Sequence, residues 1–384
     1  YFGGGGGVDD DVQLLSLGEY MWGNSNSCDS RGWMDMSYTA WGGNDATYGN
    51  TLSAQNSDFT INMSQSFWDV YNCPEEEVTP VWVDVNDDIE IDFSEGVGDL
   101  CSITEDVWVS PDGRDDNLGT SEVEAFKTIE RALEMIAPKD DDPVLINLDA
   151  GTFAPSTTGE KFPIIMMSNV NLTGLGEDIT IIDAEQSERV ILMQSCTNNI
   201  VSDLTISGGY IMDEDCDINS GLCKRGGGMY VFSSTPILKY LTVKNNSSDE
   251  GGGIYIHSSS PSMHSVSIIE NSADRAGGVW IERSDFKMDN MLISNNAAGW
   301  MNIRFAKTST VSILNSVISN NTAGDVPGVY IDDDCDIKMV NVEISNNISD
   351  TGCSALKVYN SSLDLKNVSI VGNTGFESLC YSSS

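Results

Sequence analysis

Two sets of residues bear on whether this chain does chemistry, an acidic run and the two histidines. In the acidic run, oxygen ligands alternate at Asp213, Asp215, Asp217 and Asn219. This alternation resembles the start of a calcium loop, because calcium prefers carboxylate and amide oxygens. The glycine and the distal glutamate that such a loop needs are missing. The run is interpreted first as a solvated acidic loop and second as a calcium site, which titration calorimetry without calcium uptake would exclude.

His257 and His264 are the only histidines in the chain, and its eight arginines are scattered along the sequence. Acid and base catalysis requires two groups that converge on one bond. Acidic residues number 59, so some pair will look suitable by accident. The sequence therefore assigns no catalytic residue, and an enzyme is the less favoured interpretation.

A third set of residues suggests binding through aromatic rings. Rings recur one repeat apart at Tyr230, Tyr255, Trp280, Phe305 and Tyr330. The alternate positions are apolar, so the rings are expected on the outer face of a sheet. Exposed rings in line stack on sugars or anchor a protein partner. The alternative is that they stack on one another or are covered by the first domain. Arg304 breaks the pattern, and a shift of one residue there would turn Phe305 inward.

These positions require an element that repeats about every 25 residues. Six asparagines recur at nearly constant steps of one repeat: Asn246, Asn271, Asn296, Asn321, Asn347 and Asn373. The positions three and eight residues before each one are apolar throughout, which indicates one core shared by stacked coils. We expect the asparagines to hydrogen-bond from coil to coil as an Asn ladder. The turn preference of Asn explains its presence but not the constant column.

The repeating unit is of the β type. Stretches such as Ile254-Tyr255-Ile256 are β-branched and aromatic and follow pairs of glycines, which predicts strands bounded by turns. A repeat of this length suits three short strands per coil, with parallel neighbours ~4.8 Å apart. The predicted fold class is all-β, a parallel β-helix of about 25 residues per coil.

Three parts follow one another along the chain. Residues 1–100 begin with a glycine tract and then alternate around Trp82 and Ile91, which predicts a small β-rich domain of unknown role with no visible repeat. Residues 101–143 contain an entry strand and an apolar helical stripe at 126, 129, 132, 133 and 136, a helix suited to cap the open end of a solenoid. Residues 144–384 supply the coils.

Composition limits the partners. The formal net charge is 19 minus 59, or −40, which repels nucleic acid and anionic membranes. No run approaches the ~18 apolar residues of a membrane span. The chain begins with Tyr1 rather than Met, which allows for a signal segment that has been removed.

Cysteines and glycosylation motifs both favour secretion. Nine cysteines indicate an oxidising compartment. Cys216 and Cys223 are placed to close a small loop in the acidic insertion, and Cys353 and Cys380 are expected on adjacent coils. If the second Asn of each Asn pair faces inward, the better glycosylation candidates are Asn245, Asn320, Asn360 and Asn367.

Several segments together resemble a known family. Residues 107–113, 117–120, 126–129 and 150–153 are similar to the entry segment of pectate-lyase-like right-handed parallel β-helix proteins. The later Gly-Gly-Ile-Tyr and Ile-Ser-Asn-Asn-Thr-Ala repeats are similar to those of secreted and surface-displayed members. The resemblance covers roughly residues 107–380 and implies the right-handed fold. That fold carries lyases, hydrolases, adhesins and fibres. The Gly-His-Gly turn of family hydrolases is absent.

The sequence therefore predicts a non-catalytic β-helix protein, secreted or at the cell surface, with a structural or adhesive role. A repeating subunit of a surface fibre is the most specific version of this prediction. A polysaccharide lyase or glycoside hydrolase is the alternative, and a glycan-binding module is third. The expected partners are copies of the chain and glycans. Calcium is the one cofactor that the sequence suggests.

Overall fold

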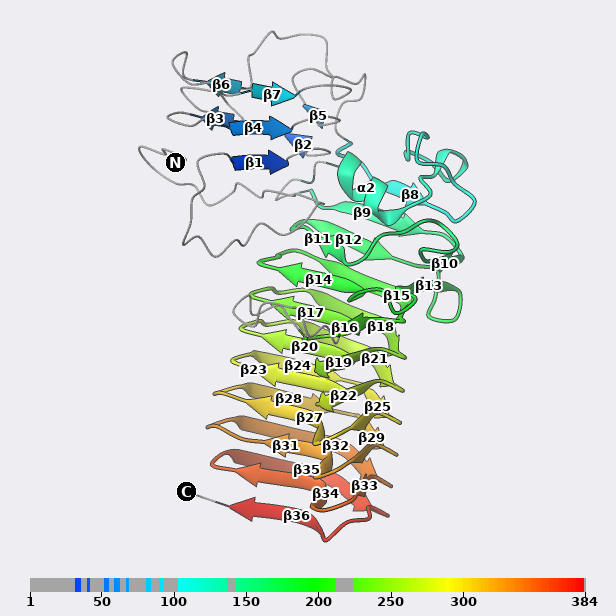
Figure 1. Cartoon of the computed structure of the whole chain (residues 1–384). Coiled ribbons are helices and arrows are strands. Elements are labelled where there is room, and N and C mark those ends of the chain that lie inside the picture. Colours follow the sequence, from blue (N-terminus) through cyan, green and yellow to red (C-terminus); the bar gives the residue numbers. More distant parts are fainter. Residues whose placement is uncertain are drawn as a thin grey trace. The chain divides into compact units, whose positions relative to one another are not determined.

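The computed structural model describes residues 103–136, 138, 142–211 and 224–382 in full, and seven short backbone strands within the first hundred residues. Figure 1 shows their course. The chain divides into two compact units, one of Tyr1–Thr104 with Leu133–Ala137 and one of Glu105–Ala132 with Pro138–Ser384. Both units are built from parallel strands.

The first unit contains coils that the sequence did not reveal. Its strands form three parallel sheets, β1-β4-β7, β2-β5 and β3-β6. Gly32 pairs with Phe59 and Thr60 pairs with Glu90, so the second coil is longer than the first. The interpretation that this region contains no repeat is therefore wrong. Its coils differ in length, and this variation hides the period in the sequence. The strands are β1 (Gly32–Asp35), β2 (Ala40–Trp41), β3 (Leu52–Ala54), β4 (Phe59–Asn62), β5 (Phe67–Trp68), β6 (Val81–Val83) and β7 (Glu90–Asp92).

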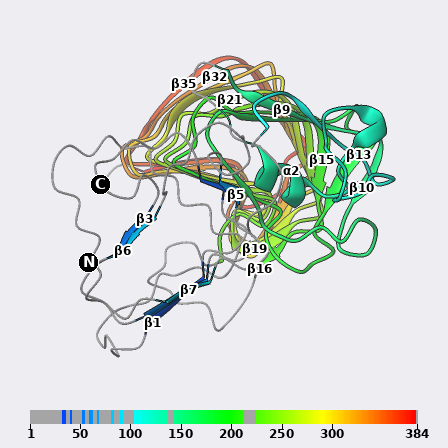
Figure 2. The same ribbon diagram turned by 90° about the horizontal axis from the view of Figure 1, so that it is seen from above.

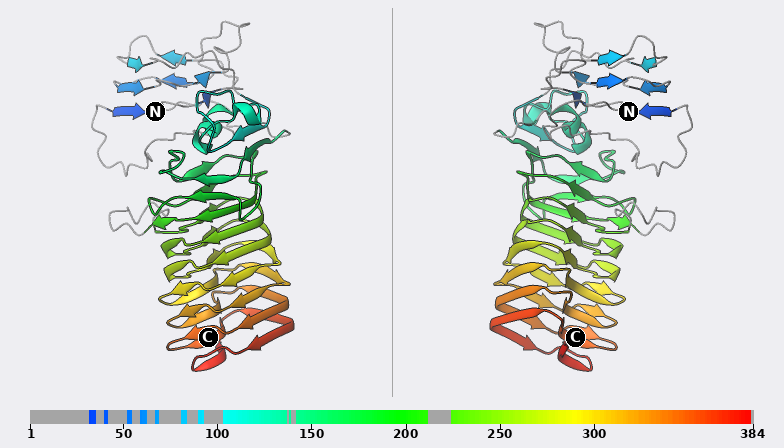
Figure 3. Two further views of the ribbon diagram at one scale, coloured as in Figure 1. Left: turned by 90° about the vertical axis from the view of Figure 1, so that its right-hand side faces the viewer. Right: turned by 90° about the vertical axis from the view of Figure 1, so that its left-hand side faces the viewer.

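The second unit is a right-handed parallel β-helix of about 26 residues per turn. Its coils contribute strands to three parallel sheets of 14, nine and six strands. Met229 pairs with Ile254 and Ile254 pairs with Val279, one coil apart each time. Seen along the stack in Figure 2, the coils superpose, and the side views of Figure 3 show the strands in ladders.

The three sheets of the second unit have the following strands. The 14-stranded sheet contains β8 (Val107–Val109), β9 (Val144–Leu148), β10 (Gly151–Phe153), β12 (Val170–Thr173), β13 (Thr180–Asp183), β15 (Ile200–Ser207), β18 (Ile237–Lys244), β21 (Ser262–Ile269), β24 (Asp285–Asp289), β25 (Leu292–Ser294), β28 (Thr310–Leu314), β29 (Val317–Ser319), β32 (Asp336–Ser345) and β35 (Ser362–Val371). The nine-stranded sheet contains β11 (Ile164–Met166), β14 (Ile191–Gln194), β17 (Met229–Phe232), β20 (Ile254–His257), β23 (Val279–Glu282), β27 (Met301–Ala306), β31 (Val326–Ile331), β34 (Cys353–Tyr359) and β36 (Glu377–Ser382). The six-stranded sheet contains β16 (Tyr210–Ile211), β19 (Ser247–Glu250), β22 (Ser272–Arg275), β26 (Ala297–Ala298), β30 (Thr322–Ala323) and β33 (Ile348–Ser349).

A column of asparagine, with a column of left-handed residues before it, shapes the corner between the 14-stranded and six-stranded sheets. The ladder asparagines are superposed, and from Asn271 onward each Oδ1 accepts the backbone N–H and the side-chain Nδ2 of the asparagine one coil earlier at 2.9–3.1 Å. The residue before each one has a positive φ, for example 57° at Asn295 and 56° at Asn320. Asn tolerates this left-handed conformation better than most residues, which explains the Asn pairs.

Helical structure in the described residues is limited to η1 (Glu122–Glu124), a 3₁₀ turn, and α2 (Ile129–Met135). The helical stripe expected there is found, but the helix is shorter than the stripe. The backbone N–H groups of Ile129 and Glu130 donate to the Glu160 carboxylate at 2.8 and 2.9 Å, so Glu160 satisfies the free donors of the helix start. That α2 covers the open end of the coils stays a prediction.

No helix in the described ranges is both long enough and apolar enough to cross a membrane.

Candidate binding face of the nine-stranded sheet

The aromatic column lies on the outer face of the nine-stranded sheet. The pairing register places six side chains in one row, Tyr230, Tyr255, Trp280, Arg304, Tyr330 and Lys357. β27 pairs with β23 one residue short of the usual step, Trp280 with Arg304, so Arg304 enters the row and Phe305 pairs with Ile281. Phe305 is fully buried. Its inclusion among the outward rings is wrong, and the shift of one residue that Arg304 suggested is what occurs.

The rings do not form the exposed platform that the sequence suggested. Tyr230, Tyr255 and Trp280 are only 3%, 0% and 3% exposed, and Tyr330 is partly buried. The ring centroids of Tyr230 and Tyr255 are 5.4 Å apart, and those of Tyr255 and Trp280 are 5.6 Å apart. The alternative, in which rings stack on one another and stabilise the sheet, describes this row.

Basic side chains cover these rings and explain their burial. Arg189 lies over Tyr230 and Arg225 over Tyr255, with 5.3 Å and 5.0 Å from cation to ring centroid. Over Trp280 lie Arg275 at 5.5 Å and Arg304 at 4.3 Å. Over Tyr330 lie Arg304 at 6.0 Å and Lys357 at 5.5 Å. All lie within the ~6 Å at which a cation attracts an aromatic face. We define these four rings and five cations, Tyr230, Tyr255, Trp280, Tyr330, Arg189, Arg225, Arg275, Arg304 and Lys357, as the ring–cation band. Four of the eight arginines of a chain with net charge −40 belong to it.

The sequence contained a signal of this band that was missed. Arg225 and Arg275 are separated by two coils with Glu250 midway, and the three residues pair on neighbouring rungs. Arg225 Nε lies 2.9 Å from Glu250 Oε2, and Arg275 contacts the other oxygen of the same carboxylate. The interpretation of the arginines as scattered is therefore wrong, because two arginines that lie two coils apart in sequence share one carboxylate on the rung between them.

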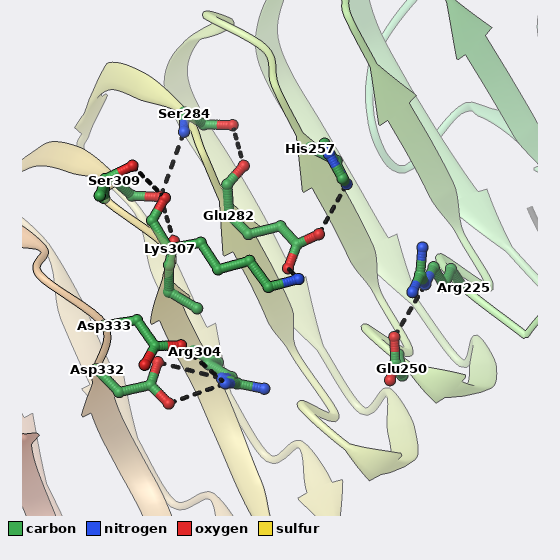
Figure 4. A network of polar contacts seen from close by, with 12 residues as sticks. Arg225, Glu250, His257, Glu282, Ser284, Arg304, Lys307, Ser309, Asp332 and Asp333 are labelled. Atoms are coloured by element: carbon green, nitrogen blue, oxygen red, sulfur yellow. Dashed lines mark hydrogen bonds and ion pairs between the residues drawn. The ribbon is translucent and has the colours of Figure 1, made fainter. Parts of the chain in front are cut away.

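A second charged cluster, His257, Glu282 and Lys307, lies beside the band (Figure 4). Glu282 is almost fully buried; its Oε1 lies 2.7 Å from His257 Nδ1 and its Oε2 lies 2.6 Å from Lys307 Nζ. Burial acts to raise the pKa of the Glu282 carboxyl, but hydrogen bonds from His257 and Lys307 outweigh it and bring the pKa well below its ordinary value. Glu282 is therefore a permanent carboxylate, which we call the centre of the His–Glu–Lys cluster.

Two buried donors of the band lack a hydrogen-bond partner among the described residues. They are the Tyr255 hydroxyl and the Trp280 indole Nε1–H. Burial, followed by the negative charge of Glu282, raises the pKa of Tyr255 far above its ordinary value, so the hydroxyl keeps its proton. A buried donor without an acceptor costs about 1–3 kcal/mol of stability. Two such donors on one face therefore need an explanation.

The same face also carries cations that reach the surface. The side chains of Arg275 and Lys307 are 47% and 42% exposed, and that of Lys357 is 32% exposed. Each has more N–H groups than its carboxylate partner accepts. The face therefore offers a ligand spare N–H donors on cations that are already paired with carboxylates, which suits a ligand rich in oxygen.

The other expected sites fall in different places. Asp213, Asp215, Asp217 and Asn219, with Cys216 and Cys223, lie outside the described residues. Cys353 and Cys380 form a disulfide between adjacent coils, with Cα atoms 6.0 Å apart. Within the described ranges, the residues close enough together to share a metal ion are Cys353, Glu377 and Cys380. Both cysteines are already bonded to each other in that disulfide.

Burial separates the glycosylation motifs. Asn245, Asn320 and Asn367 are exposed and Asn360 is partly exposed, whereas Asn246 and Asn347 are 1% and 0% exposed within the ladder. We predict that expression in a glycosylating host adds sugar to Asn245 and Asn320 and leaves Asn246 and Asn347 bare, because the ladder amides have no free N–H. Glycopeptide mass spectrometry checks this, and sugar mainly on Asn246 and Asn347 contradicts it.

Residues 112–380, more than two thirds of the chain, match one protein family. The chain belongs to the DUF1565 family. That family is described as a protein of unknown function, so membership carries no activity. No curated protein matches the chain by sequence.

Solved structures similar to this DUF1565 member are β-helix enzymes of low sequence identity. Pectate lyase Pel9A gives a TM-score of 0.47 at 12% identity, covering 73% of this chain and 80% of that one. Pectin methylesterase PemA from Erwinia chrysanthemi gives 0.33 at 12% identity, covering 68% and 90%. The A-module of the Azotobacter vinelandii mannuronan C-5 epimerase AlgE4 gives 0.23 at 13% identity, covering 63% and 91%. At these values the similarity assigns no activity to this chain.

Proposed function

We propose that the chain is a non-catalytic, adhesive β-helix that binds acidic polysaccharide through the ring–cation band. The observation that carries the proposal is the set of partly exposed cations, Arg275, Lys307 and Lys357, on one face. A uronate chain offers carboxylates to the spare N–H groups of these cations. Charge-assisted hydrogen bonds of this kind are the strong ones in carbohydrate and carboxylate recognition.

A rigid binding scaffold suits this face better than a catalytic one. Glu250 is bound by Arg225 and Arg275, and Arg304 Nη2 lies 2.8 Å from Asp332 Oδ2. Each of these pairs joins neighbouring rungs. The carboxylates of the band therefore brace the stack.

An enzyme that acts on polysaccharide is the second candidate, and one observation favours it. Glu282 Oε1 holds His257 through Nδ1, with the two atoms 2.7 Å apart. A carboxylate that orients one nitrogen of an imidazole is part of the arrangement of a general base. Release of unsaturated products or reducing ends from polygalacturonate, lost in His257→Gln, would establish this second candidate and displace the first.

We also propose an extracellular setting and assembly with further copies of the chain. The Cys353–Cys380 disulfide supports the first, because such bonds persist in oxidising compartments. Assembly has the weaker support of a stack whose strand edges are suited to further pairing. Sedimentation that finds only monomers at high concentration, with and without calcium, counts against it.

Arg275→Ala is predicted to weaken binding to polygalacturonate by about tenfold or more, because it removes a charge-assisted contact at the most exposed cation of the band. Titration calorimetry measures the loss, and binding of wild type is expected to fall with added salt. Lys338→Ala, at an exposed position on β32 in the 14-stranded sheet, is the matched control and should bind as wild type does. Equal losses in both variants, or no binding of wild type to any acidic glycan, contradict the proposal.

A further inference from the structure

One exposed aromatic ring beside the ring–cation band does not belong to it. Trp300 stands between β26 of the six-stranded sheet and β27 of the nine-stranded sheet and is 39% exposed. Among the tryptophans whose burial the structure describes, Trp280 is 3% exposed and Trp108 is partly buried, so solvent reaches Trp300 most. A single exposed apolar residue is common on protein surfaces. The surroundings of Trp300 therefore decide whether it has a function.

Hydrogen bonds hold Trp300 in one orientation. Its backbone N–H donates to the Asp274 carbonyl at 3.0 Å, and its own carbonyl accepts the N–H of Asp325 at 2.9 Å. The indole Nε1–H donates to Asp325 Oδ2 at 3.1 Å, and Lys357 Nζ lies 2.5 Å from the same oxygen. The indole also meets the Tyr330 ring, with centroids 5.9 Å apart. A ring that is already held in place loses little conformational entropy when a ligand covers it.

Trp300 lies between two exposed cations of the band along the stack. Ala273 pairs with Ala298 on the next coil. The same step of 25 residues places Arg275 level with Trp300, one coil earlier. Lys357 lies on β34, two coils after β27. Since coils are ~4.8 Å apart, these three residues span ~14 Å of the stack.

We infer that Trp300 is a stacking subsite for a sugar ring of the bound polysaccharide, and that it makes this face selective for uronate polymers over other polycarboxylates. This inference rests on the proposed function of the band. The C–H groups on one face of a pyranose ring carry a small positive charge and fit the negative face of an indole. Carboxylates of the neighbouring sugars then meet Arg275 and Lys357, whose side chains are 47% and 32% exposed.

Charge on either side of Trp300 sets the direction of the ligand carboxylates. Asp274 on β22 and Asp350 after β33 are exposed acids on the side of the six-stranded sheet. They repel an anionic ligand there. Arg275 and Lys357 lie over rings of the nine-stranded sheet. The ligand carboxylates are therefore expected on that second side, with the sugar face against Trp300.

The experiment is calorimetric titration of the full chain with polygalacturonate and with poly-L-glutamate, which carries carboxylates but no sugar ring. The quantity compared is the ratio of the two dissociation constants at equal carboxylate concentration, for wild type, Trp300→Ala, Trp300→Phe and Tyr240→Ala. Tyr240 is the matched control, because its ring is 46% exposed but lies on β18 in the 14-stranded sheet.

Wild type and Tyr240→Ala are expected to bind polygalacturonate about threefold or more tighter than polyglutamate, the size of one ring contact. Trp300→Ala is expected to bind the two polymers about equally. Trp300→Phe keeps a smaller ring and loses the hydrogen bond to Asp325, so its ratio should lie between those of wild type and Trp300→Ala.

The two proposals fail in different ways. Wild type that binds polyglutamate as tightly as polygalacturonate, or a wild-type ratio that survives in both Trp300 variants, overturns the inference and leaves the proposed function intact. Equal loss of affinity for both polymers in Trp300→Ala assigns the ring a structural role and also overturns the inference. Absence of wild-type binding to both polymers overturns the inference and the proposed function together.

Discussion

Asn296→Ala is expected to lower the free energy of unfolding of the β-helix by about 3–5 kcal/mol, because it removes four hydrogen bonds from a buried site. Asn296 is 1% exposed. Its Oδ1 accepts the backbone N–H and Nδ2 of Asn271, and its Nδ2 donates to Ile268 and Asn321. Alanine leaves the two Asn271 donors buried without an acceptor. Denaturant unfolding followed by circular dichroism measures the loss.

Asn295→Gly is the control for this prediction. Asn295 is adjacent, exposed and has a φ of 57°, a conformation that glycine adopts without strain. Its substitution is expected to change the free energy of unfolding by less than about 0.5 kcal/mol. If Asn296→Ala is no more harmful than Asn295→Gly, the ladder does not stabilise the stack and the six asparagines are turn residues only.

The architecture of the second unit was predictable because the register between coils of a solenoid appears in the sequence as a repeat. A nearly fixed coil length places residues one repeat apart on top of one another, so a column of like residues is a list of direct contacts. The ladder through Asn246 and Asn271 and the disulfide between Cys353 and Cys380 followed from that alone. In the first unit the same logic failed, because its successive coils differ in length and no column of like residues forms at a constant step.

The surface was harder to predict than the core. Alternation correctly placed Tyr255 and Trp280 on the outer face, but it could not show that Arg225 and Arg275 lie over those rings. A long side chain reaches sideways to a neighbouring column, and this reach depends on rotamers that no periodicity encodes. The expected exposed platform became a buried one for that reason.

The irregular coil shows a second limit. A shift of one residue between β23 and β27 replaced Phe305 by Arg304 in the outer row and placed Arg304 between the rings of Trp280 and Tyr330. The charged residue at an otherwise apolar position indicated an irregularity there. That this cation joins two rungs of the ring–cation band depends on side-chain conformation, which the repeat pattern does not encode.

A carboxyl group far along the chain from this band should make stability depend on pH. Glu160 is 2% exposed and accepts the backbone N–H groups of Ile129 and Glu130 at the start of α2. Burial raises its pKa to about 7 from an ordinary value of 4.5, and the two donors only partly offset this. Because the folded chain holds a proton that the unfolded chain releases, stability is full below about pH 4.5 and falls as pH rises to about 7.

The expected loss from this one group is about 3 kcal/mol across that range, at about 1.36 kcal/mol for each unit of pKa. Glu160→Gln cannot ionise, so it is expected to remove this part of the pH dependence, and its stability should not fall between about pH 4.5 and about pH 7. Denaturant unfolding at a series of pH values measures both slopes. Glu124→Gln, at an exposed position in η1, controls for the general loss of one negative charge from a chain of net charge −40. If both variants change the slope equally, long-range repulsion rather than the burial of Glu160 sets the pH dependence, and the cap at α2 is held by a carboxylate that stays charged.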